Sequence, residues 1–253
     1  MSEAQRNVVV TGGAGGIGRA TCLRLARDGH AVGVWDLDGQ GAEDLAAQIR
    51  SQGGRAAGAA CDVSDRASVD AARERTQQEL GVISGLVSNA GIDKLSLFHE
   101  SDPAHWRRIL DVNLVGALNV AHALLPAMIG SGGGRIVCIS SDAARVGSTG
   151  EAVYAAAKAG LLGFVKTLAR ETARHGIAVN AICPGPTDTN LLELVRNGPK
   201  GDRIIEGMAR AIPMGRIGQP TDIAGVVAFF LSHDAGYVTG QVLSVSGGLT
   251  MAG

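Results

Sequence analysis

The chain has 253 residues, 45% of them hydrophobic, and no Pro- or Ser-rich linker divides it, so we expect one domain over residues 1–253 with one large core. Its formal net charge is -1 and no block of like charge occurs, which argues against nucleic acid or an anionic membrane as a partner. No apolar stretch approaches the roughly eighteen residues of a spanning helix and no signal-peptide core is present, so we expect a cytoplasmic protein.

The first predicted unit is a strand, a glycine-rich loop and a helix. Residues 7–10 are a short β-branched run, residues 11–18 are rich in glycine, and a helical pattern then continues to Gly29. Glycines remove Cβ atoms where a diphosphate must approach the main chain, and the free N–H groups of a helix start favour that anion. Alone, such a loop is a weak signal, because many glycine clusters are only turns.

The second predicted strand, residues 31–35, ends in an acidic residue. Asp36 stands eighteen residues after Gly18, where a carboxylate accepts hydrogen bonds from both ribose hydroxyls of an adenosine and repels a 2′-phosphate. No Arg or Lys at positions 13–15, 37 or 38 offsets that repulsion. The sequence therefore predicts NAD rather than NADP as the cofactor.

Strand and helix patterns alternate along the rest of the chain. Helices are predicted through Leu45 and Ile49, over 65–80, from Pro103 past Asn113 to Met128 with Ser101 or Asp102 as the cap, and over 151–175. Further strands are predicted at 55–61, 82–88, 135–140, 177–182 and 241–245. This alternation requires right-handed crossovers and predicts an α/β fold, a seven-stranded parallel sheet with helices on both faces.

Polar and small residues close the third and fourth predicted strands. Asp62 follows the third strand, and Asn89, Ala90 and Gly91 follow the fourth. Ligands of open α/β sheets bind at the carboxyl ends of strands, so these residues are candidates for cofactor contacts. Asp62 has a second interpretation, as a cap of the following turn.

A Tyr and a Lys form the most informative pair in the chain. Tyr154 and Lys158 lie four residues apart on one helix face, and Ser141 lies thirteen residues before Tyr154. A phenol titrates near 10, and a lysine about 4 Å away would favour the phenolate by on the order of 4 kcal/mol. Tyr154 would then exchange protons with an alcohol. By itself the pair has a second interpretation, a packed Tyr and a solvated Lys on an amphipathic helix.

Taken in order, the motifs resemble those of the short-chain dehydrogenase/reductase family over essentially the whole chain. They are residues 11–18, Asp62, residues 89–91, Asn113, Ser141, Tyr154 with Lys158, and Pro184 with Gly185. The resemblance implies a Rossmann-type, doubly wound sheet. It also implies that Ser141 and Tyr154 bond the substrate oxygen, that Lys158 binds the nicotinamide ribose and lowers the tyrosine pKa, and that Asn113 supports a proton relay through water. Ser140 is the competing serine, disfavoured by its spacing to Tyr154.

The expected cofactor-binding residues come from several strand ends. They are Gly12, Gly15, Gly16, Ile17, Gly18, Asp36, Leu37, Asp62, Val63, Asn89, Ala90, Gly91, Tyr154, Lys158, Pro184, Gly185, Thr187 and Thr189. Two residues depart from the family pattern, Ser88 where a second Asn is common and Thr187 where Ile or Val is frequent. Neither departure removes a proton-transfer group.

No metal site is predicted. Cys22, Cys61, Cys138 and Cys183 are irregularly spaced, without a CxxC pair, and are expected to be buried free thiols. The six His residues form no ligand motif and are expected at the surface or in loops.

The substrate is expected to lie under a lid at about residues 187–216, a segment rich in Gly, Pro and charge. Residues 141–154, 183–190 and 246–251 resemble a group within the family, the 2-hydroxycyclohexanecarboxyl-CoA dehydrogenases. That resemblance implies a bulky cyclic or aryl secondary alcohol, such as this thioester, a cyclohexanol or a 1-arylethanol. Five basic residues either meet CoA phosphates or are solvated charges: Arg145, Lys200, Arg203, Arg210 and Arg216.

These observations predict NAD-dependent, reversible oxidation of such an alcohol to its ketone. A 3-oxoacyl-thioester reductase is the first alternative, which Asp36 disfavours because that biosynthetic role usually draws on NADPH. The second is a non-catalytic NAD(H)-sensing module, expected to have lost a proton-transfer group. We expect a homotetramer, because helices at 112–128 and 152–173 carry more apolar surface than one sheet face covers and family members pair such helices.

Overall fold

A seven-stranded parallel sheet forms the centre of the computed structural model, which describes residues 5–189, 192–193, 196–197 and 201–252. The strand order is β3-β2-β1-β4-β5-β6-β7, so the order reverses between β1 and β4. The strands are β1 (Asn7–Thr11), β2 (Ala31–Asp36), β3 (Arg55–Ala60), β4 (Gly85–Ser88), β5 (Gly134–Ile139), β6 (Ile177–Pro184) and β7 (Val242–Val245). Ligands of such sheets bind where the order reverses, at the strands' carboxyl ends.

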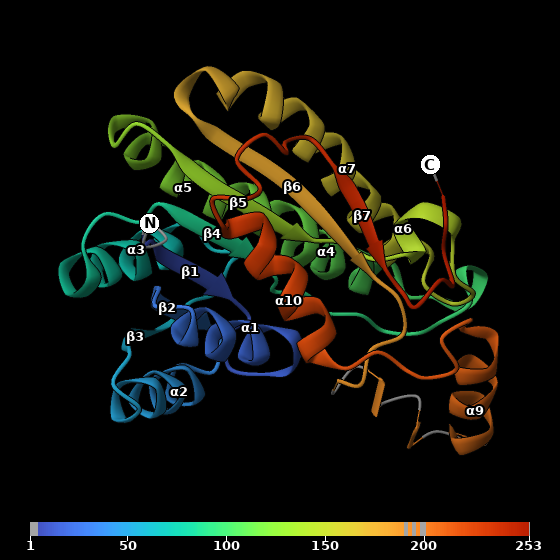
Figure 1. Ribbon diagram of the computed structural model, residues 1–253. Helices are drawn as coiled ribbons and strands as arrows, with labels where there is room; N and C mark the ends of the chain where they lie inside the picture. The colour runs from blue at the N-terminus through green and yellow to red at the C-terminus, as the bar shows by residue number, and fades with distance from the viewer. Residues whose placement is uncertain (1–4, 190–191, 194–195, 198–200, 253) are drawn as a thin grey trace.

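Helices cover both faces of this sheet (Figure 1). One face carries α1 (Gly16–Arg27), α2 (Gly39–Ser51) and α10 (Pro220–Leu231), and the other carries α3 (Arg66–Leu80), α5 (Gly116–Gly130) and α7 (Ala152–Thr172). Shorter helices are α4 (Pro103–Leu110), α6 (Ala143–Val146) and α9 (Gly201–Ala211). The predicted fold class, a Rossmann-type doubly wound sheet, is confirmed.

Alternation of side chains along β1 explains why both faces need cover. Val9 is buried in the core shared with α3, α5 and α7, whereas Val8 and Val10 are buried in the core shared with α1, α2 and α10. Successive side chains of a strand point to opposite faces, so a continuous apolar run requires helices on each side.

The predicted helix from Pro103 to Met128 is interrupted. Asp102, rather than Ser101, caps α4 by accepting a hydrogen bond from the Ala104 N–H at 2.9 Å. The helix changes at Asp111–Val115 to a π-helical turn before α5 begins. Such turns insert an extra residue per turn and occur often at functional sites. This turn contains Asn113.

Three further features differ from or complete the predictions. Helix α10 was not predicted, although Gln219 and Asp222 form a capping box around Pro220 before an apolar run. His30 lies in a loop, between α1 and β2, as expected, but it is buried there and its Nδ1 accepts a hydrogen bond from the Arg6 N–H at 3.1 Å. The four cysteines are buried and free, as predicted.

Two helical stretches, Pro103–Gly130 and Ala152–His175, are long and apolar enough to cross a membrane by length and composition alone. This corrects the expectation that no stretch approaches that length. Within their most apolar windows, 50% and 39% of the residues are buried in the protein, and Leu124 and Val165 belong to the core against the sheet. Core helices pass the same test, so the finding is a weak indication of a membrane.

Close packing of α2 on β3 depends on Gly58. A methyl group there would lie 2.5 Å from Glu43 Cα and 2.6 Å from its nitrogen, both backbone atoms. We expect Gly58→Ala to lower the free energy of unfolding by about 1–3 kcal/mol in urea denaturation. Gly130→Ala is the matched control, because no atom lies within 4 Å of the added methyl group. It should leave stability unchanged or raise it by up to about 1 kcal/mol, and equal losses in both variants would contradict the prediction.

Candidate active site

The glycine loop joins β1 to α1 at the point where the strand order reverses. A methyl group at Gly18 would lie 1.9 Å from the Gly12 carbonyl oxygen, so the helix start packs directly on the loop. Gly12 has a φ of 62°, which glycine adopts without strain. By contrast, no atom lies within 4 Å of a methyl group built at Gly15, the cap of α1. The loop therefore leaves open space at a helix N-terminus, which suits a diphosphate.

Asp36 ends β2 beside this loop. Its Oδ2 accepts a hydrogen bond from the Ala14 N–H at 2.9 Å, and its Oδ1 accepts one from the Asp38 N–H at 3.0 Å. These two bonds fix the carboxylate at the loop, while the neighbouring Leu37 side chain is 65% exposed. Ile17, in the first turn of α1, packs against the core.

Asn89 ties the ends of β1 and β4 together. Its Nδ2 donates to the carbonyl oxygens of Thr11 at 3.0 Å and Gly12 at 3.1 Å. The N–H groups of Asn89 and Ala90 both donate to Thr11 Oγ1 at 3.0 Å. The Asn89 side chain therefore holds the loop in shape, and the buried Thr11, which was not among the predicted site residues, is its partner.

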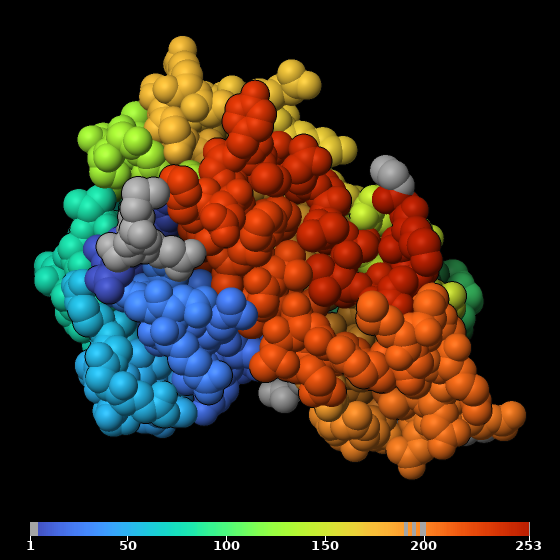
Figure 2. Space-filling model, in the orientation of Figure 1, coloured from blue at the N-terminus to red at the C-terminus, as the bar shows by residue number. Residues whose placement is uncertain are grey.

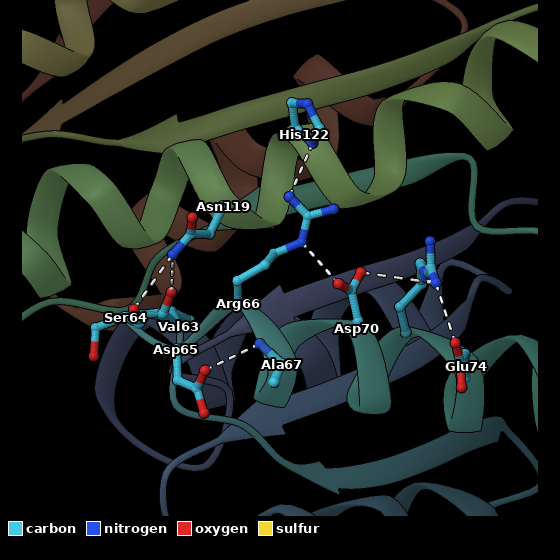
Figure 3. A network of polar contacts seen from close by, with 10 residues as sticks. Val63, Ser64, Asp65, Arg66, Ala67, Asp70, Glu74, Asn119 and His122 are labelled. Atoms are coloured by element: carbon cyan, nitrogen blue, oxygen red, sulfur yellow. Dashed lines mark hydrogen bonds and ion pairs between the residues drawn. The ribbon is translucent and has the colours of Figure 1, made fainter.

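Hydrogen bonds hold the turn after β3, and Figure 3 shows those that Asn119 donates to Val63 and Ser64. Asp62 Oδ1 accepts from the Ser64 N–H at 2.9 Å and hydroxyl at 2.6 Å, and these bonds lower the pKa of Asp62. Asn119 of α5, also missed from sequence, donates to the Val63 carbonyl oxygen at 3.0 Å. The Val63 side chain lies against Gly116, where a methyl group would come within 2.6 Å of Val63 Cγ2. Asp62 therefore caps the turn that follows β3.

The segment after β6 lies over the glycine loop. Gly185, next to Pro184, approaches Ser246 so closely that a methyl group would lie 2.7 Å from Ser246 Cβ. The Thr187 hydroxyl donates to the Gly185 carbonyl oxygen at 2.9 Å. Thr189 Cγ2 lies 3.4 Å from a methyl group built at Gly16. The two predicted cofactor segments therefore face each other.

Adjacent serines at the end of β5 have different partners. Ser140 is buried and its hydroxyl donates to the Lys158 carbonyl oxygen at 2.8 Å, which joins β5 to α7. The Ser141 hydroxyl bonds Tyr154, which lowers the tyrosine pKa, and accepts from the Ala143 N–H at 3.1 Å. Ser141 is therefore the serine that reaches the phenol.

Lys158 and Asn113 approach each other across Gly91. Asn113 Nδ2 donates to the carbonyl oxygens of Ile92 at 2.7 Å and Ile109 at 2.9 Å, which orients the amide. Its Oδ1 is buried and accepts no hydrogen bond from the described residues. A methyl group at Gly91 would lie 2.7 Å from that Oδ1 and 3.2 Å from Lys158 Nζ. The absence of a side chain at Gly91 thus opens the space between the amide oxygen and the ammonium.

Burial dominates the electrostatics of Tyr154 and Lys158. It raises the pKa of Tyr154, the charges of Glu151 and Asp93 raise it further, and the Ser141 bond opposes them. Burial also lowers the pKa of Lys158 to about 8, and Lys158 Nζ lies 5.7 Å from the centre of the Tyr154 ring. This corrects the electrostatic expectation, because burial dominates and raises the pKa of Tyr154, and only the Ser141 bond lowers it.

A cavity of about 190 Å³ opens beside Tyr154. It is lined by the loop after β4, by α4 and by residues 150–154, and apart from Tyr154 none of its residues was predicted as a site residue. Phe98 and Trp106 stack at its edge with ring centroids 5.0 Å apart. The lining therefore combines a stacked aromatic pair with polar and charged side chains.

The expected lid contains α9, which projects from the body beside the C-terminal segment (Figure 2). Its base is anchored, because the Met214 N–H donates to the Gly247 carbonyl oxygen at 3.0 Å. Of the candidate CoA contacts, Arg145 instead donates to Ser244 and to the Ala252 carbonyl, and Arg216 pairs with Asp222. Arg203 and Arg210 are exposed on α9, and Lys200 lies outside the described residues.

No metal cluster accompanies these groups. Within the described parts of the chain, no three His, Cys, Asp or Glu residues are arranged to hold a metal ion. The sheet, the glycine loop at its switch point and the Ser-Tyr-Lys group define a dinucleotide-binding oxidoreductase of the Rossmann type.

Comparison with known proteins identifies the family. The family model described as enoyl-(acyl carrier protein) reductase matches residues 12–250. The chain is 41% identical over 251 residues to the short-chain reductase protein NovJ of Streptomyces niveus, covering 98% of this chain and 95% of that protein. It is 40% identical over 248 residues to the cis-4-hydroxycyclohexanecarboxylate dehydrogenase of Sinomonas cyclohexanicum, covering 98% and 97%. The chain belongs to the short-chain dehydrogenase/reductase family and is an oxidoreductase that acts on CH–OH groups.

A solved structure matches the fold closely. The 3-oxoacyl-[acyl-carrier protein] reductase with bound NAD from Brucella melitensis has a TM-score of 0.90 and 36% sequence identity. The match covers 99% of this chain and 93% of that one. A nicotinamide dinucleotide cofactor therefore fits this fold.

Substitution of the two serines separates their roles. Ser141→Ala removes the hydroxyl that bonds Tyr154, and we expect kcat to fall by about 10²-fold or more. Loss of its bond to the Ala143 N–H should lower stability only slightly, by about 1 kcal/mol. Ser140→Ala removes the side-chain hydrogen bond that joins β5 to the Lys158 carbonyl of α7, and we expect a loss of about 1 kcal/mol in stability with a smaller loss of turnover. Steady-state kinetics and thermal melting by circular dichroism measure both effects. The assignment is wrong if Ser141→Ala keeps full activity while Ser140→Ala abolishes it.

Proposed function

We propose that the chain catalyses the NAD-dependent, reversible oxidation of a bulky cyclic or aryl secondary alcohol to its ketone. The observation that carries this proposal is the meeting of Ser141, Tyr154, Lys158 and Asn113 beside a cavity with a stacked aromatic pair. A flat ring packs well against aromatic side chains. The cyclohexane ring in the name of the Sinomonas relative supports the same substrate class.

Each member of the group has a chemical role in this proposal. Tyr154 accepts the hydroxyl proton of the alcohol, and Ser141 donates a hydrogen bond to the substrate oxygen as it gains charge. Lys158, held by its bond to the Ile139 carbonyl oxygen at 3.0 Å, binds the nicotinamide ribose. Asn113 Oδ1 accepts from the water that relays the proton. When bound, the oxidised nicotinamide supplies the hydride acceptor and a positive charge that favours the phenolate.

NAD rather than NADP is the proposed cofactor. The Asp36 carboxylate is fixed beside the glycine loop by two N–H groups, where it would meet the adenosine ribose. A 2′-phosphate there would face a negative charge without a basic partner at positions 37 or 38. The bound NAD of the Brucella reductase supports this choice.

The alternatives follow from the same site. A 3-oxoacyl-thioester reductase is supported by the name of the Brucella structure, and Asp36 is the residue that argues against it. A CoA thioester nevertheless remains a substrate candidate, with Arg203 and Arg210 exposed on α9. A non-catalytic NAD(H) sensor is disfavoured because all four proton-transfer residues are present.

We also propose a cytoplasmic homotetramer in which the lid at 187–216 closes over the substrate. Exposed apolar residues on α5 and its preceding turn support the assembly, namely Val115, Leu118 and Ile129. Leu243 is exposed on β7, an edge strand that has one partner strand in the sheet. Pairing between copies would cover such surfaces.

A steady-state panel tests the proposed function. Cyclohexanols, 1-phenylethanols and hydroxyacyl-CoA thioesters are each assayed with NAD and with NADP, and the ketones are assayed in the reverse direction. We expect turnover of the ring-bearing alcohols with NAD at least about tenfold faster than with NADP. Comparable rates with both cofactors contradict the cofactor choice, and tight NADH binding without any turnover favours the sensor.

The pH profile tests the role of Tyr154. The Glu151 charge raises the pKa of Tyr154, so Glu151→Gln lowers that pKa. Because Tyr154 must be deprotonated to accept a proton, we expect the rise of kcat/KM for alcohol oxidation to move to lower pH. The control is Glu74→Gln, because Glu74 is exposed on α3 and removing its charge leaves the site unchanged. An identical shift in the control, or none in Glu151→Gln, refutes this role.

A further inference from the structure

Two carboxyl groups line the cavity beside Tyr154. Asp93 follows β4 and Glu151 precedes α7, so the fold brings them together from distant parts of the sequence. Asp93 Oδ1 accepts a hydrogen bond from the Lys94 N–H at 2.7 Å. Asp93 Oδ2 is buried and accepts no bond from a donor among the described residues. Both residues line the same cavity, and Glu151 lies close enough to raise the pKa of Asp93.

The charge of Asp93 persists at neutral pH. Burial and the nearby Glu151 raise the pKa of Asp93 to about 6, so Asp93 is mostly ionised at pH 7.5. The charges of both residues also act on Tyr154, which places them within electrostatic reach of the reacting oxygen. An anion placed between Tyr154 and the pair would lose its hydration and face a like charge.

The other charged groups of the cavity lie at its exposed rim. Lys94 Nζ lies 3.2 Å from His105 Nε2, and His105 Nδ1 lies 3.6 Å from Asp102. Glu100 is also exposed. Solvent screens these rim charges more than it screens the pair beside Tyr154.

We propose that Asp93 and Glu151 determine substrate specificity: they select rings that carry a neutral hydrogen-bond donor and reject rings that carry a carboxylate. A hydroxyl or amide group on the ring would donate a hydrogen bond to the carboxylates that line the cavity. A carboxylate in the same position has no proton to donate and meets repulsion. The inference rests on the proposed function for its substrate class, but it concerns binding in the cavity rather than turnover.

Binding of two matched ligands tests the inference without requiring catalysis. Cyclohexanecarboxamide and cyclohexanecarboxylate share their size and ring, and differ in charge. Titration of each into the NADH-loaded protein at pH 7.5 by calorimetry gives the two dissociation constants. We expect the amide to bind at least about tenfold more tightly. Equal binding, tighter binding of the carboxylate, or no binding of either ligand at millimolar concentration overturns the inference.

Variants identify the residues responsible. Asp93→Asn, Glu151→Gln and the double variant remove the charge with little change of size, and we expect the amide preference to fall toward unity. Glu74→Gln on α3 is the charge control and should keep the preference. Lys94→Gln should keep or increase it, because it removes a cation from the rim. A preference that survives in the folded double variant overturns the inference. Turnover of cyclohexanol, measured in parallel, tests the proposed function separately.

Discussion

The buried ammonium of Lys158 is the constraint on which the candidate site depends. Its Nζ donates to the Ile139 carbonyl oxygen, and its own carbonyl oxygen accepts from Ser140, so two bonds lock α7 to the end of β5. Burial of a cation is costly, as the lowered pKa of Lys158 shows, and hydrogen bonds must offset part of that cost. One helical turn earlier on α7, Tyr154 is thereby held at the carboxyl edge of the sheet.

A second constraint is the departure of the Asn113 region from regular helix. The π-helical turn at Asp111–Val115 allows the amide to donate both to Ile92 and to Ile109, which leaves its oxygen facing the space beside Lys158. Gly91 makes that space accessible, since any side chain there would collide with the amide oxygen. Three elements meet at the site: the loop after β4 with Gly91, the π-helical turn with Asn113 and α7 with Lys158. They can lie this close together because Gly91 has no side chain and because the turn departs from regular helix.

The sequence predicts the features whose patterns are local and misses those that depend on distant residues. The seven strands, the glycine loop and the Tyr154–Lys158 pair depend on periodicity and short spacing, and the fold confirmed the sheet they imply. The π-helical turn has no periodicity of its own. The cavity residues between 93 and 102 lie in a loop whose one regular part is a short 3-10 helix, Phe98–Glu100. The side-chain hydrogen bonds of Asn89 and Asn119 join residues far apart in sequence. The sequence also did not predict that the pKa of Tyr154 is raised, because this shift depends on desolvation, which only packing determines.

That shift bears on the direction of the reaction. In the chain alone, burial and the charges of Glu151 and Asp93 keep the proton on Tyr154, so the phenol is an acid ready to protonate a ketone oxygen that receives a hydride. Alcohol oxidation requires the opposite state, which the positive charge of an oxidised nicotinamide and a higher pH both favour. The carboxyl pair therefore affects substrate choice and proton equilibrium together. A substitution that admits anionic rings by removing this charge will also make the tyrosine a better base, because the two effects share one electrostatic cause.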